Sequence, residues 1–112
     1  MAATATTNVW ATKAAMPTAR DGLTVGVVNG IVYVIGGSGS GGNLTKVEAY
    51  TPGSNTWTAK ASLPQGRSAL NGSGTINGVL YVAGGLSSNG ATTTTYAYNP
   101  STNTWATKAP SA

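Results

Sequence analysis

One segment of the chain occurs three times. NVWATKAAMP at residues 8–17 returns as NTWTAKASLP at 55–64 and as NTWATKAPSA at 103–112. The residues between these segments repeat as well, because NGIVYVIGG at 29–37 matches NGVLYVAGG at 77–85. Equivalent residues lie 47 or 48 positions apart. The chain is therefore two copies of one unit plus a third tryptophan segment, and a fixed period of this length indicates a repeat architecture.

Each unit has the signals of a four-stranded antiparallel sheet. In the first unit, Asn29-Gly30 joins the apolar runs LTVGVV and IVYVIG. Asn-Gly is the dipeptide that best suits a type I′ hairpin. The turn TPGSN then joins VEAY to TWTAK in a second hairpin, with Pro and Gly setting the reversal. We therefore predict an all-β chain in which each unit is one blade of a β-propeller.

A set of glycine and aromatic positions recurs in register between the units. Hydrophobic runs end in Gly36-Gly37 and Gly84-Gly85, and the aromatic pairs that follow are Tyr50 with Trp57 and Tyr98 with Trp105. The combination resembles the kelch repeat over nearly the whole chain. The resemblance implies structural roles for these residues and for Trp10. The glycines would adopt backbone conformations that a Cβ obstructs, and the aromatic side chains would pack between blades.

The resemblance also orders the strands of each blade from a, at the propeller channel, to d, at the outer edge. Strand a is expected at 23–28 and 70–76, strand b at 31–36 and 79–84, strand c at 45–50 and 93–98, and strand d at 56–60 and 104–108. Residues 1–15 are then an extra d-like outer segment, residues 16–62 the first blade and residues 63–112 the second.

Two blades leave two apolar sheet faces without a neighbouring blade. Repeat folds bury such faces by stacking one repeat on the next, and kelch propellers resemble closed rings of about six or seven blades. We therefore expect a homo-oligomer in which copies of the chain close head to tail around a rotation axis. A trimer with six blades is favoured, and a tetramer with eight blades is next.

The three tryptophan segments exceed the two outer strands that two blades need. In a ring, the segment around Trp10 of one chain and the segment around Trp105 of its neighbour compete for one sheet edge. The sequence leaves open which of the two segments completes the blade. It also leaves open whether the chain is a designed protein or a piece of a longer natural one.

The composition excludes most catalytic chemistry. The chain has 112 residues, contains no His and no Cys, and has Asp21 and Glu48 as its only acidic residues. General acid–base catalysis lacks nearly all of its usual groups. Cysteine nucleophiles, Ser-His-Asp triads, disulfides, structural zinc and His-ligated metal sites are excluded. We therefore expect no enzymatic activity, no metal and no cofactor, while the redox compartment stays open.

One glycine pattern imitates a dinucleotide-binding loop. Gly37, Gly39 and Gly42 match G-x-G-x-x-G after an apolar strand. Such a loop needs a following helix and an acidic residue about 20 positions later. Here strand-forming residues follow, no acidic residue lies beyond Glu48, and the equivalent loop GGLSSNGA lacks the spacing. The match is a coincidence of a glycine-rich loop.

The charge pattern argues against two classes of partner. The net charge is +4, but the Lys and Arg residues are scattered singly, whereas a nucleic-acid-binding surface concentrates them. No apolar run reaches membrane-spanning length. The N-terminus MAATATTNVW lacks the basic and apolar regions of a signal peptide. We expect a soluble protein that binds neither nucleic acid nor membrane, and its localisation is left open.

Ligand recognition is expected on the face formed by the b–c and d–a loops. The a–b and c–d turns repeat closely, whereas SGSGGN differs from LSSNGA, and PTARDG differs from PQGRSALN. Variation on a rigid scaffold is where recognition usually lies. The candidate ligand-binding residues there, besides two arginines, are Asp21, Ser38, Ser40, Asn43, Ser68, Asn71, Ser87, Ser88 and Asn89.

The two arginines of the d–a loops, Arg20 and Arg67, have two interpretations. In a closed ring they form a circle of guanidinium groups near the channel mouth, which would hold a carboxylate or phosphate. An anionic small molecule or an acidic peptide is then the expected ligand, with Asp21 partly neutralising Arg20. Alternatively, each arginine fastens its own loop by bonding backbone carbonyls of the neighbouring blade.

Two functions follow from the sequence. The first is a non-enzymatic, self-assembling kelch propeller scaffold with two blades per chain. The alternative is a module that binds a protein, peptide or glycan through the b–c and d–a loop face.

Overall fold

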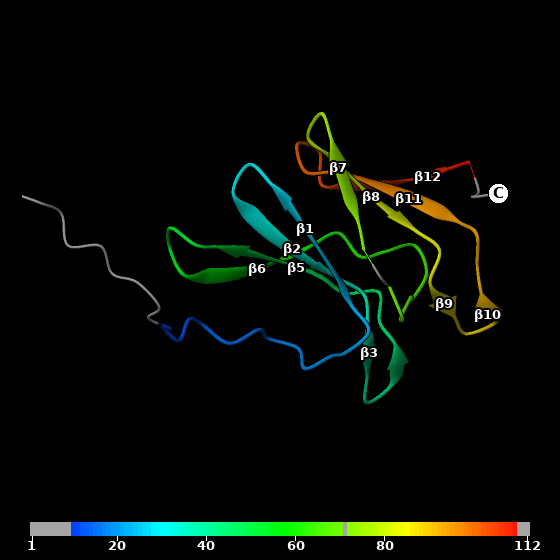
Figure 1. Ribbon diagram of the computed structural model, residues 1–112, viewed down its shortest axis with the longest axis horizontal. Coiled ribbons are helices and arrows are strands. Elements are labelled where there is room, and N and C mark those ends of the chain that lie inside the picture. The colour runs from blue at the N-terminus through cyan, green and yellow to red at the C-terminus, as the bar shows by residue number, and fades with distance from the viewer. Residues whose placement is uncertain (1–9, 71, 110–112) are drawn as a thin grey trace, which may run out of the picture.

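The computed structural model describes residues 10–70 and 72–109 and contains two four-stranded antiparallel sheets (Figure 1). The first sheet has the order β1 (Thr24–Val28), β2 (Ile31–Ile35), β5 (Val47–Thr51), β6 (Thr56–Lys60). The second has β7 (Gly74–Ile76), β8 (Val79–Ala83), β11 (Thr95–Asn99), β12 (Thr104–Lys108). Each sheet is one blade with its strands in chain order. The all-β fold class and the two-blade organisation are confirmed.

The tight turns have the backbone conformation that Asn-Gly indicates. Asn29 and Gly30 have φ values of 51° and 76°, and Asn77 and Gly78 have 52° and 77°. Two successive positive φ values are the mark of a type I′ turn, whose twist matches the strands that it joins. These turns fix the register of the inner strands, so that Val28 pairs with Ile31 and Ile76 with Val79.

Two small hairpins lie in the b–c loops and were not predicted. They are β3 (Ser38–Gly39) with β4 (Gly42–Asn43), and β9 (Leu86–Ser87) with β10 (Gly90–Ala91). Their strands have two residues each, which is too short for an alternating hydrophobic pattern to reveal. In Figure 1 these hairpins lie at the opposite end of the blades from the tight turns.

The predicted strand bounds hold best at the outer edge, where β6 and β12 match strand d. The largest difference is at β7, which begins at Gly74 instead of residue 70. The backbone N–H of Leu70 donates instead to the Gly22 carbonyl of the first blade, at 3.0 Å, and the Leu70 side chain is buried. Leu70 therefore joins the two blades and does not extend the inner strand.

The hydrophobic core lies between the two blades. We call the face of a blade that meets the following blade its downstream face, and the opposite face its upstream face. The buried residues on the downstream face of the first blade are Val28, Tyr33, Ile35, Val47 and Ala49. Those on the upstream face of the second blade are Leu80, Val82, Tyr96 and Tyr98. Leu63 and Leu70 of the connecting loop complete the core.

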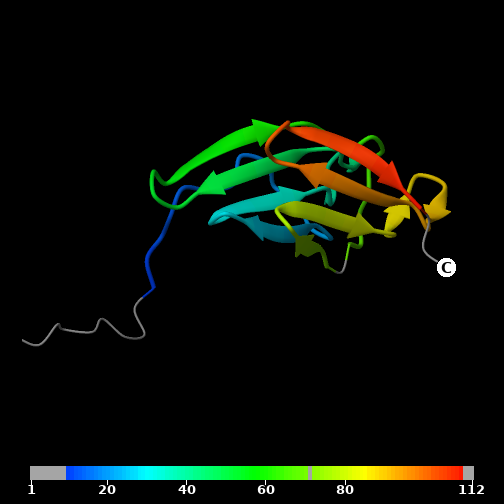
Figure 2. The ribbon, with the colours of Figure 1, turned by 90° about the horizontal axis from the view of Figure 1, so that it is seen from above.

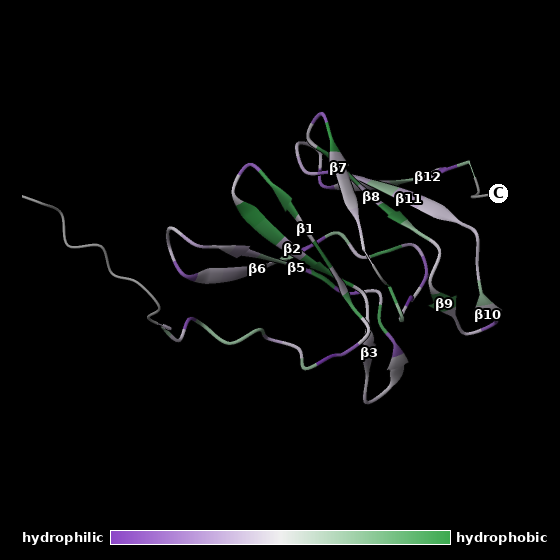
Figure 3. Cartoon of the chain, viewed as in Figure 1, coloured by the Kyte–Doolittle hydropathy of each residue, from purple (hydrophilic) through white to green (hydrophobic). Residues whose placement is uncertain are grey.

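The two blades lie in the same orientation. Seen from above, the strands of both run in the same order, from β1 and β7 on one side to β6 and β12 on the other (Figure 2). The most hydrophobic ribbon belongs to the inner strands β1, β2 and β8, whereas β6 is pale (Figure 3). The inner edge is not buried throughout, because all three residues of β7 are exposed.

Candidate functional site

The b–c and d–a loops form one connected surface at the end of the blades, as expected. Asp21 and Ser38 exchange two backbone hydrogen bonds, of 3.1 and 2.7 Å, and Ser68 and Leu86 exchange two of 2.9 and 2.8 Å. Each pair joins a d–a loop to the b–c loop of the same blade. The backbone N–H of Gly37 also donates to the Arg67 carbonyl, at 2.7 Å. The two blades are thus joined through backbone groups on this face.

The glycine pairs permit this close approach. Gly37 has a φ of 105°, and a Cβ at this position would lie 2.7 Å from the Asp21 carbonyl oxygen. Gly36 has a φ of 64°, and its Cβ would lie 2.8 Å from the Arg67 carbonyl oxygen. In the second blade, the Cβ of Gly85 would meet the Ser68 carbonyl oxygen at 3.0 Å. The structural role predicted for these glycines follows from both their φ values and the lack of space.

A pocket of about 420 Å³ opens on the loop surface where the two blades meet. It is lined by Gly41, Gly42, Asn43, Gln65, Gly66 and Ser88. These residues come from the b–c loops of both blades and the d–a loop between them. Their side chains contribute amide and hydroxyl groups and no charge. The pocket can therefore supply hydrogen bonds to a neutral polar ligand, such as a sugar or a peptide backbone.

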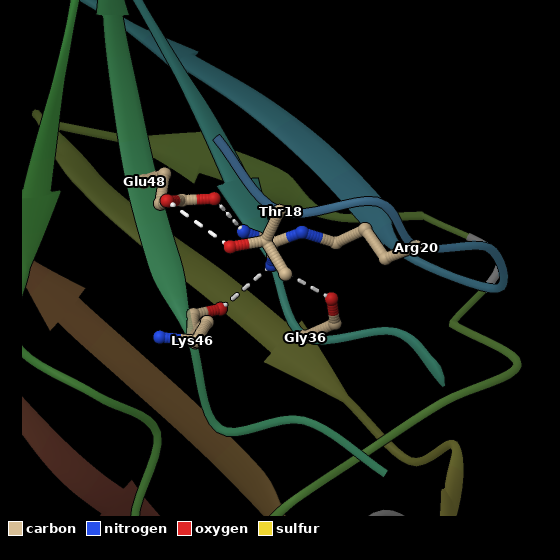
Figure 4. Close-up of polar contacts among 5 residues, drawn as sticks. All are labelled: Thr18, Arg20, Gly36, Lys46 and Glu48. Carbon is tan, nitrogen blue, oxygen red and sulfur yellow. Dashed lines mark hydrogen bonds and ion pairs between the residues drawn. The ribbon is translucent and has the colours of Figure 1, made fainter. Parts of the chain in front are cut away.

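Arg20 is buried against the first blade and bonds it through both terminal nitrogens of its guanidinium, while its buried Nε has no hydrogen-bond partner among the described residues (Figure 4). Its Nη1 donates to the carbonyl oxygens of Gly36 and Lys46, at 2.8 and 2.9 Å. Its Nη2 forms an ion pair with Glu48, whose other carboxylate oxygen accepts a bond from the Thr18 hydroxyl. The Arg20 side chain has no exposed surface. These contacts fasten the loop before β1 to strand β5.

Arg67 holds the equivalent place in the second blade and has no solvent exposure at all. Its Nη1 donates to the Gly84 carbonyl at 3.1 Å, and its Nη2 donates to Gln65 and to the Tyr96 hydroxyl. The guanidinium carbon also lies 4.7 Å from the centre of the Tyr96 ring, in a cation–π contact. Both arginines therefore bond carbonyls, as the alternative interpretation proposed, although the carbonyls belong to their own blade.

The other predicted ligand residues divide into two groups. Asn43 and Ser88 line the pocket, where the Asn43 amide also donates to the Leu86 carbonyl at 3.4 Å. The residues that lie in the same loops and hairpins but do not line the pocket are Asp21, Ser38, Ser40, Ser68, Ser87 and Asn89. Asn71 lies outside the described residues. Sequence reasoning missed Gly41, Gly42, Gln65 and Gly66, because nothing in the repeat marks one position of a variable loop over another.

A second constellation joins each blade to the segment that precedes it. In the second blade, the Asn103 side-chain oxygen accepts bonds from the Tyr98 hydroxyl and the Ala61 backbone N–H, at 2.6 and 2.8 Å. The Trp105 indole N–H donates to the Ala61 carbonyl at 2.8 Å. Tyr98 and Trp105 pack together, with ring centres 5.0 Å apart. We call this Tyr–Asn–Trp set the tryptophan clamp, because it binds both the backbone N–H and the backbone carbonyl of one residue.

The first blade has the same clamp. The Asn55 oxygen accepts bonds from the Tyr50 hydroxyl and the Ala14 N–H, at 2.6 and 2.9 Å. The Trp57 indole donates to the Ala14 carbonyl at 2.9 Å. Asn55 and Asn103 have φ values of 53° and 54°, a conformation that Asn tolerates better than most residues. The role of asparagine in the clamp was not predicted. The sequence signal that could have revealed it is the NTW triplet, which occurs at both clamps.

Burial at equivalent positions shows where each blade lacks a neighbour. On downstream faces, Val28 of the first blade is 4% exposed, whereas its equivalent in the second blade, Ile76, is 63% exposed. On the upstream face of the first blade, Val25 and Val27 are 46% and 53% exposed. The downstream face of the second blade and the upstream face of the first are therefore open apolar surfaces.

The open downstream face contains a pocket of about 230 Å³, lined by Val79, Tyr81, Ala97, Asn99, Thr104, Ala106 and Lys108. The equivalent position on the first blade contacts the second blade, where Tyr33 meets Tyr98 with ring centres 5.5 Å apart. Burial raises the pKa of Tyr98 to about 12, to which neighbouring Tyr33 contributes, and burial also raises the pKa of Tyr33.

The extra tryptophan segment has no strand among residues 10–16. Trp10 is 98% exposed, and residues 1–9 of the d-like segment expected at 1–15 lie outside the described residues. Its pairing with a second chain stays a prediction. Within residues 10–70 and 72–109, no group of acidic side chains is suited to hold a metal ion. That part of the chain also has no helix long and apolar enough to cross a membrane.

Comparison with known proteins places this geometry in a family. The kelch motif matches the chain twice, at residues 19–64 and 67–111, and the chain therefore belongs to the kelch-repeat family. It is 41% identical over 63 residues to the F-box protein AFR of Arabidopsis thaliana, covering 54% of this chain and 17% of that protein. It is 36% identical over 69 residues to beta-scruin of Limulus polyphemus, covering 58% of this chain and 8% of that protein.

The chain thus spans less than a fifth of the length of either relative. Among solved structures, the one titled "Structure of YjhT" superposes with a TM-score of 0.82. The superposition covers 92% of this chain and 42% of that one, at 24% sequence identity. This likeness supports the fold alone, and with the two antiparallel blades it identifies part of a β-propeller.

Proposed function

We propose that the chain is a two-blade, non-enzymatic scaffold whose copies associate head to tail and close a β-propeller. The observation that carries the proposal is the complementarity of the two open faces. The upstream face of the first blade presents Tyr50 packed on Trp57, with ring centres 5.1 Å apart. The second blade uses the equivalent pair, Tyr98 and Trp105, to cover the first blade.

The inner strands support the same pairing. Within the chain, Leu80 lies over Gly26 so closely that a Cβ there would be 2.4 Å from the Leu80 Cδ1 atom. The equivalent glycine of the second blade, Gly74, has open space around it. In a head-to-tail assembly, the residue of the second copy that would lie over Gly74 is Val32, because Val32 is the equivalent of Leu80. One copy therefore presents aromatic and apolar side chains at one end and matching space at the other.

An arginine in the open downstream face tests the proposal. Ile76→Arg places a charge on an exposed residue, so we expect the chain to fold. The head-to-tail interface would bury that charge without a partner, which is strongly unfavourable. We expect Ile76→Arg to be monomeric by light scattering at concentrations where the unmodified chain assembles. Ser101→Arg, which adds the same charge to an exposed turn, should assemble normally. An assembled Ile76→Arg protein would contradict the proposed interface.

A second candidate function, binding at the loop face, is favoured by the 420 Å³ pocket between the blades. The uncharged lining suits a neutral ligand, and neither Arg20 nor Arg67 is part of it. We expect maltohexaose, used as a neutral probe, to shift the NMR signals of Asn43, Gln65 and Ser88, and hexaglutamate to shift them less. Ser88→Trp should abolish the shifts, and Ser54→Trp on the opposite turns should not. No shift with either probe would exclude this site for both ligand classes.

A further inference from the structure

The tryptophan clamps form a series that the chain does not complete. Ala14, Ala61 and Ala109 each lie four residues after a tryptophan, in the three copies of the same segment. The clamp of the first blade binds Ala14, and that of the second blade binds Ala61. Among the described residues, none is hydrogen-bonded to the backbone of Ala109, which follows β12 as Ala61 follows β6.

The head-to-tail assembly proposed above, on which this inference rests, brings Ala109 to a clamp that is already occupied. If copies stack as the two blades do, the Ala109 backbone of one copy reaches Tyr50, Asn55 and Trp57 of the next. That clamp contains the next copy's own Ala14. Two equivalent backbone segments therefore compete for the clamp of the first blade. One is the Ala14 segment of the same copy, and the other is the Ala109 segment of its neighbour.

We infer that the clamp formed by Tyr50, Asn55 and Trp57 is a binding site for the Ala109 segment of a second copy, and that the chain's own Ala14 segment is its competitor. Ala109 has the N–H and the carbonyl that Asn55 and Trp57 need.

The strand that leads to Ala109 is already formed, with β12 paired to β11 from Thr95↔Lys108 to Asn99↔Thr104. The segment that leads to Ala14 has no strand among residues 10–16, and Trp10 is exposed. The Ala109 segment is thus held in place before association, and ordering it costs less conformational entropy.

Assembly accordingly replaces the Ala14 segment by the neighbour's Ala109 segment, and β12 remains the outer strand of its own blade. The opposite exchange would have the segment around Trp10 of one copy replace β12 on the neighbour's β11. That exchange breaks five residue pairs of an existing strand ladder, whereas release of Ala14 breaks the two hydrogen bonds of the clamp.

Two proline substitutions in the full-length chain separate the alternatives. Proline lacks the N–H that the clamp asparagine accepts. We expect Ala109→Pro to weaken assembly by severalfold to about tenfold in the dissociation constant, the loss typical of one hydrogen bond. We expect Ala14→Pro to strengthen assembly by a similar factor, because the competing segment binds less well. Sedimentation velocity over a dilution series measures both effects.

The outcomes distinguish this inference from the proposed function. Weaker assembly of Ala14→Pro, with Ala109→Pro unchanged, would overturn the inference and assign the contact to the N-terminal segment, while the ring itself would stand. Equal assembly of both variants and the unmodified chain would exclude the clamp as an intermolecular site. If the unmodified chain is monomeric, the proposed function fails first. Circular dichroism of each variant checks that the blades remain folded.

Discussion

Arg20 and Arg67 hold equivalent positions in the two repeats and differ in their partners. Arg20 is paired with Glu48, whereas Arg67 stacks on Tyr96, which occupies the position equivalent to Glu48. Each guanidinium also bonds a carbonyl of the glycine pair in its own blade, Gly36 or Gly84. Buried arginines with this many partners are structural, because removing one would leave several buried acceptors unpaired.

Tyr98 gives the fold a dependence on high pH. Its pKa in the folded chain is raised to about 12, compared with about 10 in an unfolded chain. Below pH ~10 the hydroxyl is protonated in both states, and its stabilising effect is fully present. Between pH ~10 and about 12 only the unfolded state loses the proton, so the free energy of unfolding falls.

Urea unfolding at a series of pH values measures this effect. We expect the unmodified chain to lose stability more steeply than Tyr98→Phe above pH ~10, since the variant has no proton to release at this position. The two proteins differ only at position 98, so the difference between their slopes reports the Tyr98 hydroxyl and its interaction with Tyr33. Parallel stability curves for the two proteins would contradict the assignment.

At the residue scale, the sequence predicts which positions are structurally important better than it predicts which residues their side chains contact. The glycines, tyrosines and tryptophans of the repeat were assigned structural roles because their recurring pattern resembles the kelch repeat. The partner of Arg20 was not, because its contact with Glu48 depends on how the loop before β1 crosses β5. The pocket residue Gln65 also escaped prediction, since a variable loop gives no sign of which side chain faces a cavity.

Strands and tight turns follow from local sequence, whereas the loops depend on contacts between blades. Asn-Gly specifies a type I′ turn by itself, and β6 and β12 match the predicted bounds. By contrast, the late start of β7 reflects the bond from Leu70 to Gly22 in the other blade. The residues joining the blades could not be separated from the strand by composition, because both are rich in small residues.

Glycine at position 37 is required by the approach of the loop before β1. Gly37→Ala places a Cβ 2.7 Å from the Asp21 carbonyl oxygen at a φ of 105°, so we expect a loss of more than about 2 kcal/mol in the free energy of unfolding. Gly41→Ala in the same loop has open space and no positive φ, and should change stability by less than about 0.5 kcal/mol. Equal effects of the two substitutions in thermal unfolding would refute the packing argument.

The whole molecule differs from a closed propeller at its two ends. The junction within the chain buries Val28 and covers Gly26 with Leu80, whereas the open ends expose Ile76, Val25 and Val27. The repeat in the sequence was sufficient to predict that each end of the chain has a sheet face without a neighbouring blade. It did not predict which terminal segment occupies the first clamp, because the three tryptophan segments are nearly identical. Within the chain, the backbone of Ala14 occupies the first clamp.

The mass of the assembled chain in solution tests the central claim most directly. Head-to-tail closure predicts a particle of three, or next in preference four, times the chain mass of 11.1 kDa. Sedimentation equilibrium should give this single mass over a wide dilution range, since a closed ring has no free end at which to grow or shorten. A particle with the mass of one chain and a fully folded circular dichroism spectrum would contradict the account.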